Sequence, residues 1–430
     1  MSAQPGSLYC EDPSASPSSS LADRYRSVRA HTERLCTPLL PEDSVMQTMP
    51  DVSPPKWHLA HVSWFFETFL LKPYSAGYRE FAPAFATLFN SYYEGAGAMH
   101  PRAERGRLSR PALEEVYEYR RHVDEAMMRL LEGGDAGRRR ELAFRTTLGL
   151  HHEQQHQELL LADIKHIFAS QPLRPVYRES AGADAAAPPP VRWCEYPGGL
   201  REIGHDGEGF CYDNETPRHR VWLEPFRLAT RPVTNGEFMN FMADGGYERA
   251  DLWLSDGWRA VRERGWRSPL YWEREGATWR QMTLAGMRAV DAREPVCHVS
   301  YYEADAYARW AGCRLPAEQE WEVAAAGVDV AGNFQDSGLF HPAPARTGDL
   351  AQLYGDVWEW TRSPYVAYPG FRPLAGTLGE YNGKFMSGQM VLRGGSCATP
   401  AGHIRASYRN FFYPADRWQF SGIRLADDKG

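Results

Sequence analysis

The chain has 430 residues, a formal net charge of -7 at pH 7 and 43% hydrophobic residues. This length is enough for two or three domains with separate cores. The negative charge leaves no basic face for nucleic acid, and no apolar run approaches the roughly 20 residues of a membrane span. The N-terminus lacks a secretory signal pattern, so we expect a cytoplasmic globular protein that binds neither nucleic acid nor membrane.

The first half of the chain is predicted to be a helical bundle. Residues 1–20 are rich in Ser, Pro and Ala and are expected to form a disordered tail. From residue 21 to residue 170 the apolar residues recur at helical spacing, which is typical of a four-helix bundle. The expected helices span residues 21–36, 54–71, 111–131 and 139–168.

The fourth predicted helix carries a run of His-Glu-Gln-Gln-His at 152–156. At about 100° per residue, His152 and His156 share one face of the helix with Gln155, and the apolar pattern turns that face inward. His151 points elsewhere and is not expected to be a ligand. Two imidazoles four residues apart on an inward face, with polar neighbours, predict a metal site.

The same letters also spell the His-Glu-x-x-His signature of zinc hydrolases, in which the Glu acts as a general base. Against that interpretation, Glu153 is followed by two polar Gln residues where such a helix usually packs apolar ones, and no Gly-x-x-His follows. The third metal ligand must come from another helix. The predicted helix at 54–71 offers His58 and His61, and residues at i and i+3 share a face, so the spacing leaves both open.

The second half of the chain has a different sequence pattern. Residues 171–192 contain an Ala-rich and Pro-rich stretch that is expected to be a linker between domains. After it, short apolar runs broken by Gly, Pro, Asn and Asp predict an α+β domain at 193–430 that is dominated by loops. Residues 302–310 and 317–326 are its only clear predicted helices.

Motifs in both halves resemble one family. The runs Pro-Lys-Trp-His-Leu-Ala-His at 55–61, Trp-Phe-Phe-Glu at 64–67 and residues 152–159 resemble the DinB-like domain of ergothioneine-pathway sulfoxide synthases. The second half resembles the formylglycine-generating-enzyme/sulfatase-modifying-factor fold, a C-type-lectin-like variant that is the family's other domain. The motifs that carry this second resemblance lie at 214–219, 232–238, 314–322, 355–360 and 392–396.

The resemblance implies an α+β multidomain enzyme, with a DinB-like four-helix bundle at 21–170 and the sulfatase-modifying-factor-like domain at 193–430. It further implies a mononuclear nonhaem Fe(II) enzyme that uses dioxygen to join a sulfur donor to C2 of the imidazole of hercynine, with oxidation at sulfur. Matching the motifs makes His61 the third ligand, beside His152 and His156. Three neutral nitrogens suit Fe(II) and Zn(II) alike, so the identity of the metal rests on the resemblance.

The family's loops imply further site residues. Tyr92 and Tyr93 lie in a segment that resembles the loop supplying the active-site tyrosines, with Tyr93 expected to donate a proton and Tyr92 to support it. Gln155 is expected to hydrogen-bond the substrate imidazole. In the C-terminal loop, Asn410 and Phe411 are expected to contact hercynine, whose trimethylammonium group is best held by aromatic faces.

The sulfur donor carries a carboxylate, which requires a cation in its pocket. The candidate cations are Arg102, Arg105 and Lys384. Family members that use γ-glutamylcysteine have an acidic residue where this chain has Phe412, which favours a cysteine-type thiol. The Ser-Gly-Gln run at 387–389 and Tyr413 depart from the family pattern, so the related selenoneine synthases, which join hercynine to a selenosugar, are the leading alternative. A formylglycine-generating enzyme is disfavoured, because Cys397 lacks the second C-terminal cysteine that such an enzyme needs.

Overall fold

The computed structural model describes residues 20–133, 137–180 and 187–428. The tail predicted at 1–20, except Ser20, and residues 181–186 of the predicted linker lie outside this range. The chain forms two compact units. The helical unit comprises Met1–Ile167, His205–Asp213 and Arg372–Gly383, and the sheet unit comprises Phe168–Gly204, Asn214–Phe371 and Lys384–Gly430. Two segments from the second half of the sequence therefore belong to the helical unit.

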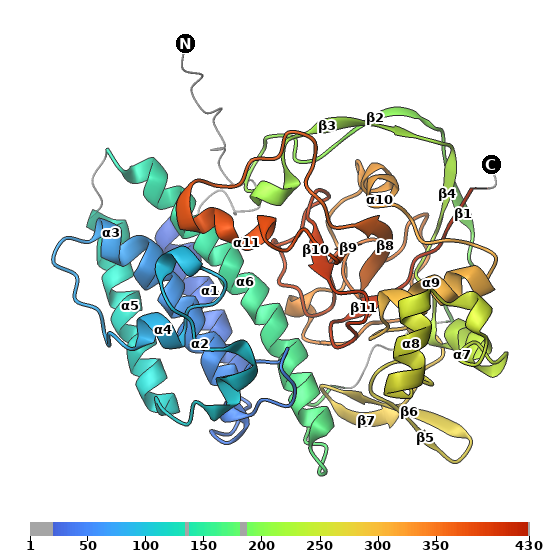
Figure 1. The fold of residues 1–430 in the computed structure, drawn as a ribbon, viewed down its shortest axis with the longest axis horizontal. Helices are drawn as coiled ribbons and strands as arrows, with labels where there is room; N and C mark the ends of the chain where they lie inside the picture. The colour runs from blue at the N-terminus through green and yellow to red at the C-terminus, as the bar shows by residue number, and fades with distance from the viewer. Residues whose placement is uncertain (1–19, 134–136, 181–186, 429–430) are drawn as a thin grey trace. The chain divides into compact units, whose positions relative to one another are not determined.

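Four long helices form the frame of the helical unit (Figure 1). They are α1 (Leu21–Cys36), α2 (Pro55–Phe66), α5 (Leu113–Gly133) and α6 (Arg139–Ser170). Short helices complete the unit: α3 (Lys72–Tyr74), α4 (Phe85–Leu88) and α11 (Glu380–Gly383). The predicted helix at 54–71 changes its hydrogen bonding at Glu67–Leu71, which forms one π-helical turn. Such turns occur mostly as single bulges in longer helices, often at functional sites.

Helix α2 is the central helix of this unit, because all twelve of its residues are buried. A helix buried on every side must satisfy its polar side chains within the protein. Lys56 does so by donating to the carbonyl oxygens of Leu108 and Pro111. Helix α6 approaches α2 closely at Gly149, where a Cβ atom would lie 2.6 Å from a ring carbon of Phe66. The single glycine of α6 therefore permits the close contact between the two helices.

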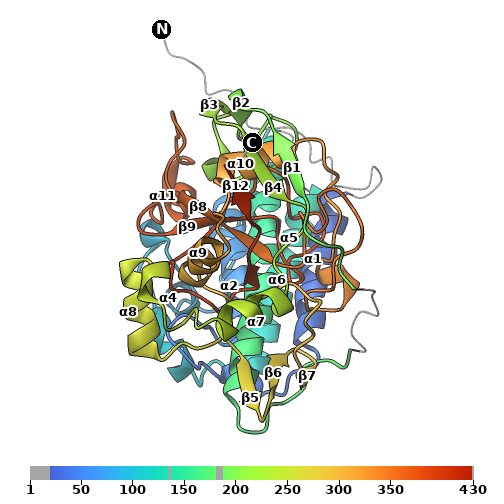
Figure 2. The same cartoon turned by 90° about the vertical axis from the view of Figure 1, so that its right-hand side faces the viewer.

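The described residues of the sheet unit form four small sheets rather than one large one. The four-stranded sheet has the order β10-β9-β8-β11, and Glu359 of β8 pairs with Arg393 of β9 in antiparallel register. Figure 2 shows β12 beside β4 in the three-stranded sheet β1-β4-β12. The remaining sheets are the pair β2-β3 and the ribbon β5-β6-β7. The strands are β1 (Trp193–Tyr196), β2 (Gly199–Ile203), β3 (His219–Leu223), β4 (Phe226–Ala229), β5 (Trp272–Glu275), β6 (Thr278–Thr283), β7 (Gly286–Ala289), β8 (Trp358–Pro364), β9 (Met390–Arg393), β10 (Asn410–Phe412), β11 (Ser421–Gly422) and β12 (Ala426–Asp427).

The sheet unit has more helices than the sequence predicted. The expected helices at 302–310 and 317–326 are present as α9 (Tyr301–Trp310) and α10 (Glu318–Ala325). The prediction that these two were the only clear helices was wrong, because α7 (Asn235–Ala243) and α8 (Ser255–Arg264) are also formed. Thr234 and Glu237 form a capping box that starts α7. Both helices are short and contain Gly, so tertiary packing rather than propensity stabilises them.

Candidate metal centre and the cavity beside it

Three histidines of the helical unit converge on one point. His61 lies on α2, and His152 and His156 lie one turn apart on α6. The Nε2 atoms of His61 and His152 are 3.2 Å apart, and one nitrogen of each of the three rings lies within 4.8 Å of the others. Within the part of the chain that the structure describes, these residues form the one group of side chains with the geometry of a metal site.

The structure distinguishes His61 from His58, which the spacing could not. Both nitrogens of His58 face protein groups: Nε2 lies 2.9 Å from Asp163 Oδ2, and Nδ1 lies 2.9 Å from Nδ1 of His156. In His61, Nδ1 lies 2.6 Å from the carbonyl oxygen of Phe89, and Nε2 faces His152 where the three rings converge. Therefore His61 is the residue of α2 that keeps a nitrogen for a metal ion.

The three converging imidazoles are neutral at neutral pH. Burial lowers the pKa of His152 to about 3. Burial is the main reason why the pKa of His61 lies well below its usual value, and the neighbouring His152 also lowers it. The pKa of His156 is likewise lowered mainly by burial and next by His61. A metal ion binds the neutral form of imidazole, and three nitrogens leave coordination positions open for other ligands. The donor set therefore fits a divalent transition metal.

Aromatic rings restrain the orientation of two of these histidines. Trp57 stacks on His61 with ring centroids 4.5 Å apart and an interplanar angle of 12°, and Trp64 stacks on it at 5.6 Å and 13°. Phe65 stacks on His152 at 4.6 Å. Because these rings are buried and packed, the nitrogens are held in place by the protein itself, as a preorganised metal site requires.

Glu153 cannot serve as the general base that a zinc hydrolase would need. Its carboxylate is fully buried and is directed toward α1 and α5. Oε2 accepts a hydrogen bond from Arg29 at 2.9 Å, and Oε1 accepts from Thr32 at 2.6 Å and from Arg120 at 3.3 Å. A carboxylate that is fully buried against two guanidinium groups and a hydroxyl is not available to take a proton from the water of a metal centre.

A small cavity lies beside His152 inside the helical unit. Two of the predicted site residues, Tyr93 and Gln155, line this cavity together with His152. The segments His205–Asp213 and Arg372–Gly383 supply other parts of its wall, which are Tyr212, Asp213, Leu374, Leu378, Tyr381 and Asn382. The sequence therefore located one side of the cavity and missed the other.

Asp213 and Tyr381 are the missed residues with the clearest chemistry. The carboxylate of Asp213 accepts hydrogen bonds from Asn382 at 2.7 Å and from the backbone N–H of Leu374 at 3.1 Å, so it ties the two segments together. Burial raises the pKa of the Tyr381 phenol, which therefore stays protonated. The one sequence signal for Tyr381 is its position three residues before the candidate Lys384, and no sequence pattern indicates that this run joins the helical unit.

The loop that carries the two tyrosines is held in an uncommon conformation. The buried side chain of Asn90 donates to the carbonyl oxygens of Tyr93 and Gly97 at 3.0 Å. Tyr92 has a φ of 67°, in the left-handed region that non-glycine residues rarely adopt. Its hydroxyl accepts a hydrogen bond from Arg102, which contributes to holding this backbone. The conformation turns Tyr93 into the cavity, where burial raises its pKa and keeps the phenol protonated.

Arg105 is a buried cation beside the metal centre. Its guanidinium stacks on Trp57 with 3.4 Å from the central carbon to the ring centroid. It donates to the hydroxyls of Ser53 at 2.9 Å and Ser91 at 2.8 Å, while Nε has no hydrogen-bond partner among the described residues. The pKa of Arg105 is lowered to about 9, mainly by burial; Tyr92 opposes this shift and Arg102 adds to it. No carboxylate of the described chain forms an ion pair with Arg105, so this guanidinium has the character of an anion-binding group.

The remaining predicted site residues belong to the sheet unit. Phe411 on β10 stacks on Tyr365 with centroids 4.1 Å apart and lies 5.7 Å from Phe385. Asn410 accepts a hydrogen bond from the backbone N–H of Phe411, and Phe412 packs edge-on against Trp418. All three are partly exposed, and Lys384 is exposed.

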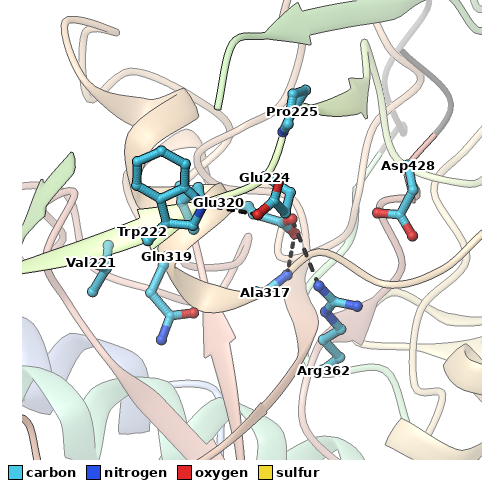
Figure 3. Close-up of a pocket in the computed structure, with 10 residues that line it drawn as sticks. Val221, Trp222, Glu224, Pro225, Ala317, Gln319, Glu320, Arg362 and Asp428 are labelled. Atoms are coloured by element: carbon cyan, nitrogen blue, oxygen red, sulfur yellow. Dashed lines mark hydrogen bonds and ion pairs between the residues drawn. The ribbon is translucent and has the colours of Figure 1, made fainter. Parts of the chain in front are cut away.

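An open groove on the sheet unit has a different character (Figure 3). Its volume is about 1200 Å³, and residues of β3 and the start of α10 line it. Its acidic groups are engaged by the protein: Glu320 accepts from both Arg314 and the backbone of Ala317, and Glu224 accepts from the exposed Trp222. Because these contacts already occupy the charged groups, we assign no catalytic function to this groove.

Comparisons with known proteins match both halves of the chain. Residues 24–160 match the DinB superfamily, and residues 191–348 and 338–429 match the sulfatase-modifying factor enzyme 1-like domain. The hercynine oxygenase of Mycolicibacterium smegmatis is 34% identical over 415 residues, covering 89% of this chain and 92% of that protein. The hercynine oxygenase of Mycobacterium tuberculosis is 34% identical over 408 residues, with coverage of 88% and 92%. The formylglycine-generating enzyme of Streptomyces coelicolor is 32% identical over 256 residues, covering 46% of this chain and 76% of that enzyme.

These findings define an oxygenase built from a DinB-type helical domain and a sulfatase-modifying-factor-like domain, as the sequence motifs predicted. The similarity to formylglycine-generating enzymes covers about half of the chain, 46% and 51% in two such enzymes, whereas that to hercynine oxygenases covers 89% and runs through both domains. The chain belongs to the hercynine oxygenase family. Among the described helices, none combines the length and the apolar character that crossing a bilayer requires.

Proposed function

We propose that this protein uses Fe(II) and dioxygen to form a carbon–sulfur bond at C2 of the imidazole of hercynine, with a cysteine-type thiol as the donor. One thiol, one imidazole C–H and one O2 give a sulfoxide and one water, so O2 accepts four electrons and its two oxygen atoms end in the sulfoxide and the water. Family membership supports the substrate, because the relatives that match most of the chain are named hercynine oxygenases. Tyr93, Gln155, Arg102, Arg105 and the sheet-unit candidates are proposed roles within this reaction.

The observation that carries the proposal is the convergence of His61, His152 and His156 beside a cavity lined by Tyr93 and Gln155. Bound Fe(II) would supply oxygen activation at positions that the three nitrogens leave open. The side-chain amide of Gln155, next to His156 on α6, can donate to or accept from an imidazole placed in this cavity. The protein thus offers three metal-binding nitrogens, a hydrogen-bonding amide and a phenol at one place.

Tyr93 is the proposed proton donor. Its phenol is buried and stays protonated, and its ring lies 5.7 Å from that of Trp64, which stacks on the metal ligand His61. A protonated phenol at the cavity wall can deliver a proton to reduced oxygen, and a productive reaction must deliver it before the thiol alone is oxidised. Tyr381 lines the same cavity and is the natural comparison, since its phenol is also buried and protonated.

Arg105 and Arg102 are proposed to bind a carboxylate of the substrates. Arg105 has lost its water and gained only neutral partners, so an incoming carboxylate restores the charge balance of this region. Replacing Arg105 with Gln removes a charged hydrogen-bond donor worth about 1.5–3 kcal/mol. We therefore expect KM for the substrate whose carboxylate it binds to rise by roughly 10- to 100-fold while iron binding is kept. Arg105→Lys keeps the charge without the planar fork and is expected to recover only part of the loss.

A selenol donor is the second candidate, and one observation favours it. The two departures from the family pattern, Gly388 and Tyr413, lie next to each other: a Cβ atom at Gly388 would be 4.0 Å from the Tyr413 ring. Gly388 also has a φ of 71°, so a side chain there is disfavoured on conformational grounds. Two neighbouring changes alter one local surface together, and this supports a donor that differs from the thiols of the family.

The test is a panel of donors with the whole protein, loaded with Fe(II) under anaerobic conditions. Oxygen uptake is expected only when hercynine and a donor are both present, and product mass identifies the donor among cysteine, γ-glutamylcysteine and a selenosugar. Absence of oxygen uptake with all three donors contradicts the proposal. A selenium-containing adduct formed in preference to the cysteine adduct would assign the second candidate.

Tyr93→Phe tests the assignment of the proton donor. This variant is expected to bind iron as the wild type does and to shift the products from the hercynine adduct toward oxidised thiol, because the phenolic proton is missing. Tyr381→Phe is measured in parallel as the matched phenol of the same cavity. If Tyr93→Phe keeps the wild-type product ratio and Tyr381→Phe does not, Tyr381 is the donor.

A further inference from the structure

His58 occupies an unusual position between two residues of α6. His156 and Asp163 are seven residues apart on this helix and so lie on the same face, and the ring of His58 from α2 fits between them. His58 and Asp163 are 2% and 3% exposed, so water does not compete for the hydrogen bond between them. Asp163 Oδ2 also accepts from the backbone N–H of Ser53 at 2.8 Å, which anchors the carboxylate to the segment preceding α2.

The N–H protons of His58 and His156, beside the carboxylate of Asp163, have one arrangement that is compatible with metal binding by His156. A carboxylate only accepts, so the Nε2 of His58 must be the N–H donor toward Asp163. A neutral imidazole carries one N–H, and the Nδ1 of His58 is then an acceptor that faces the Nδ1 of His156. His156 must donate from Nδ1, and its Nε2 is left with the lone pair that a metal ion requires. The carboxylate therefore selects, through His58, the tautomer of His156 that can bind a metal.

The other two ligands are restrained by different contacts. The Nδ1 of His61 faces the carbonyl oxygen of Phe89, a backbone acceptor that sets the same tautomer without any charge. For His152 the restraint is the stacked ring of Phe65, and its Nδ1 has no partner among the described residues. His156 is thus the one ligand of the three whose orientation depends on a carboxylate, which acts through another side chain.

We propose that His58 and Asp163 are positioning residues for the metal centre, which act as one unit to set the tautomer and the orientation of His156. This inference rests on the metal centre of the proposed function but not on its substrates or its reaction. Hydrogen-bond partners of this kind are worth roughly 10- to 100-fold in metal affinity when they are removed.

The test is the binding of Co(II) to the metal-free protein, followed by visible absorption without any substrate. Asp163→Asn and His58→Gln are each expected to weaken Co(II) binding by about 10- to 100-fold and to change the ligand-field bands of the bound ion. The control is His166→Gln, which removes another half-buried imidazole of α6, one that is hydrogen-bonded to Thr48 at 2.7 Å. The control is expected to bind Co(II) with wild-type affinity and wild-type bands.

The double variant decides whether the two residues act together. If His58 and Asp163 form one unit, the double variant binds Co(II) no more weakly than the worse single variant, since the second change removes nothing further. Losses that add in the double variant overturn the inference, as does Co(II) affinity within about twofold of wild type in both single variants. A wild-type protein that binds no Co(II) overturns the metal centre and this inference with it. Thermal melting of each metal-free variant shows that the affinities compare folded proteins.

Discussion

The sharpest consequence of the structure concerns Glu153, the residue that would be the catalytic base of a zinc hydrolase and is instead a partner of buried cations. Burial alone would raise its pKa, but the charges of Arg29 and Arg120 outweigh burial and lower it. A carboxylate with a lowered folded pKa stabilises the fold above its unfolded pKa, and this stability is lost as the pH falls through the folded value. The contribution of Glu153 is therefore fully present at pH 7.

The cost of Glu153→Gln follows from what remains around it. The amide keeps one acceptor oxygen for Thr32 and Arg120, but its NH2 group then faces a guanidinium N–H of Arg29. Breaking a buried ion pair by removing one partner costs about 3–5 kcal/mol. Arg29 retains its ion pair with Asp124 at 2.7 Å, which places the expected loss near the lower end, at about 3 kcal/mol. This is a large share of the roughly 5–15 kcal/mol that stabilise a typical domain.

The assay is urea unfolding of the metal-free protein at pH 7, with the wild type and the variant compared. The matched control is Glu141→Gln on the same helix, whose carboxylate pairs with Arg145 at the surface, at 2.6 Å and 37% exposure, and is expected to matter by about 0.5 kcal/mol or less. A loss below about 1 kcal/mol for Glu153→Gln would refute the reasoning. Loss of catalysis without loss of stability would return Glu153 to the role of a base.

Three further outcomes are expected. Gly149→Ala should destabilise the protein by about 1 kcal/mol in thermal melts, because overpacking against Phe65 and Phe66 exceeds the gain in helix propensity, and unchanged or raised stability would contradict the close contact. Burial raises the pKa of Asp356 from 3.8 to about 6, so its protonated form stabilises the fold at low pH and this contribution is lost as the pH rises through 6. The free energy of unfolding of Asp356→Asn should therefore rise relative to that of the wild type between these pH values, by at most about 3 kcal/mol. Parallel profiles of unfolding free energy against pH for the two proteins would refute this. His61→Ala should abolish stoichiometric Fe(II) binding in equilibrium dialysis, and retention of one tightly bound ion would remove His61 from the ligand set.

Much of the helical unit could be predicted from local pattern. The first helix was predicted with the bounds it has, because Ser20 and Asp23 form a capping box and the apolar face is regular. The His-bearing helix begins at Arg139 as expected and ends two residues later than predicted, at Ser170. Helices α7 and α8 were missed, since they are short and their stability comes from contacts that a local pattern does not contain.

The site was predictable only in part, for a physical reason. Periodicity put His152, His156 and Gln155 on one face, which depends on neighbours in the sequence alone. The choice between His58 and His61 depends on what each ring meets across the bundle, and only the structure shows Asp163 taking His58 out of the ligand set. Asp213 and Tyr381 were missed for the same reason. They line the cavity of the helical unit, but in the sequence they lie on segments between parts of the sheet unit.

Those two segments also limit how far the protein can be divided. A fragment cut at the linker, ending near residue 170, contains every proposed metal ligand and all four long helices. It nevertheless lacks Tyr212, Asp213 and Tyr381, so the cavity beside His152 would lose that part of its wall. Exchange of the first half between relatives, by recombination or in the laboratory, would therefore transfer a metal-binding bundle but not a complete cavity. The domain boundary that the sequence predicts at the linker is therefore not a point at which the chain can be divided while the cavity stays complete.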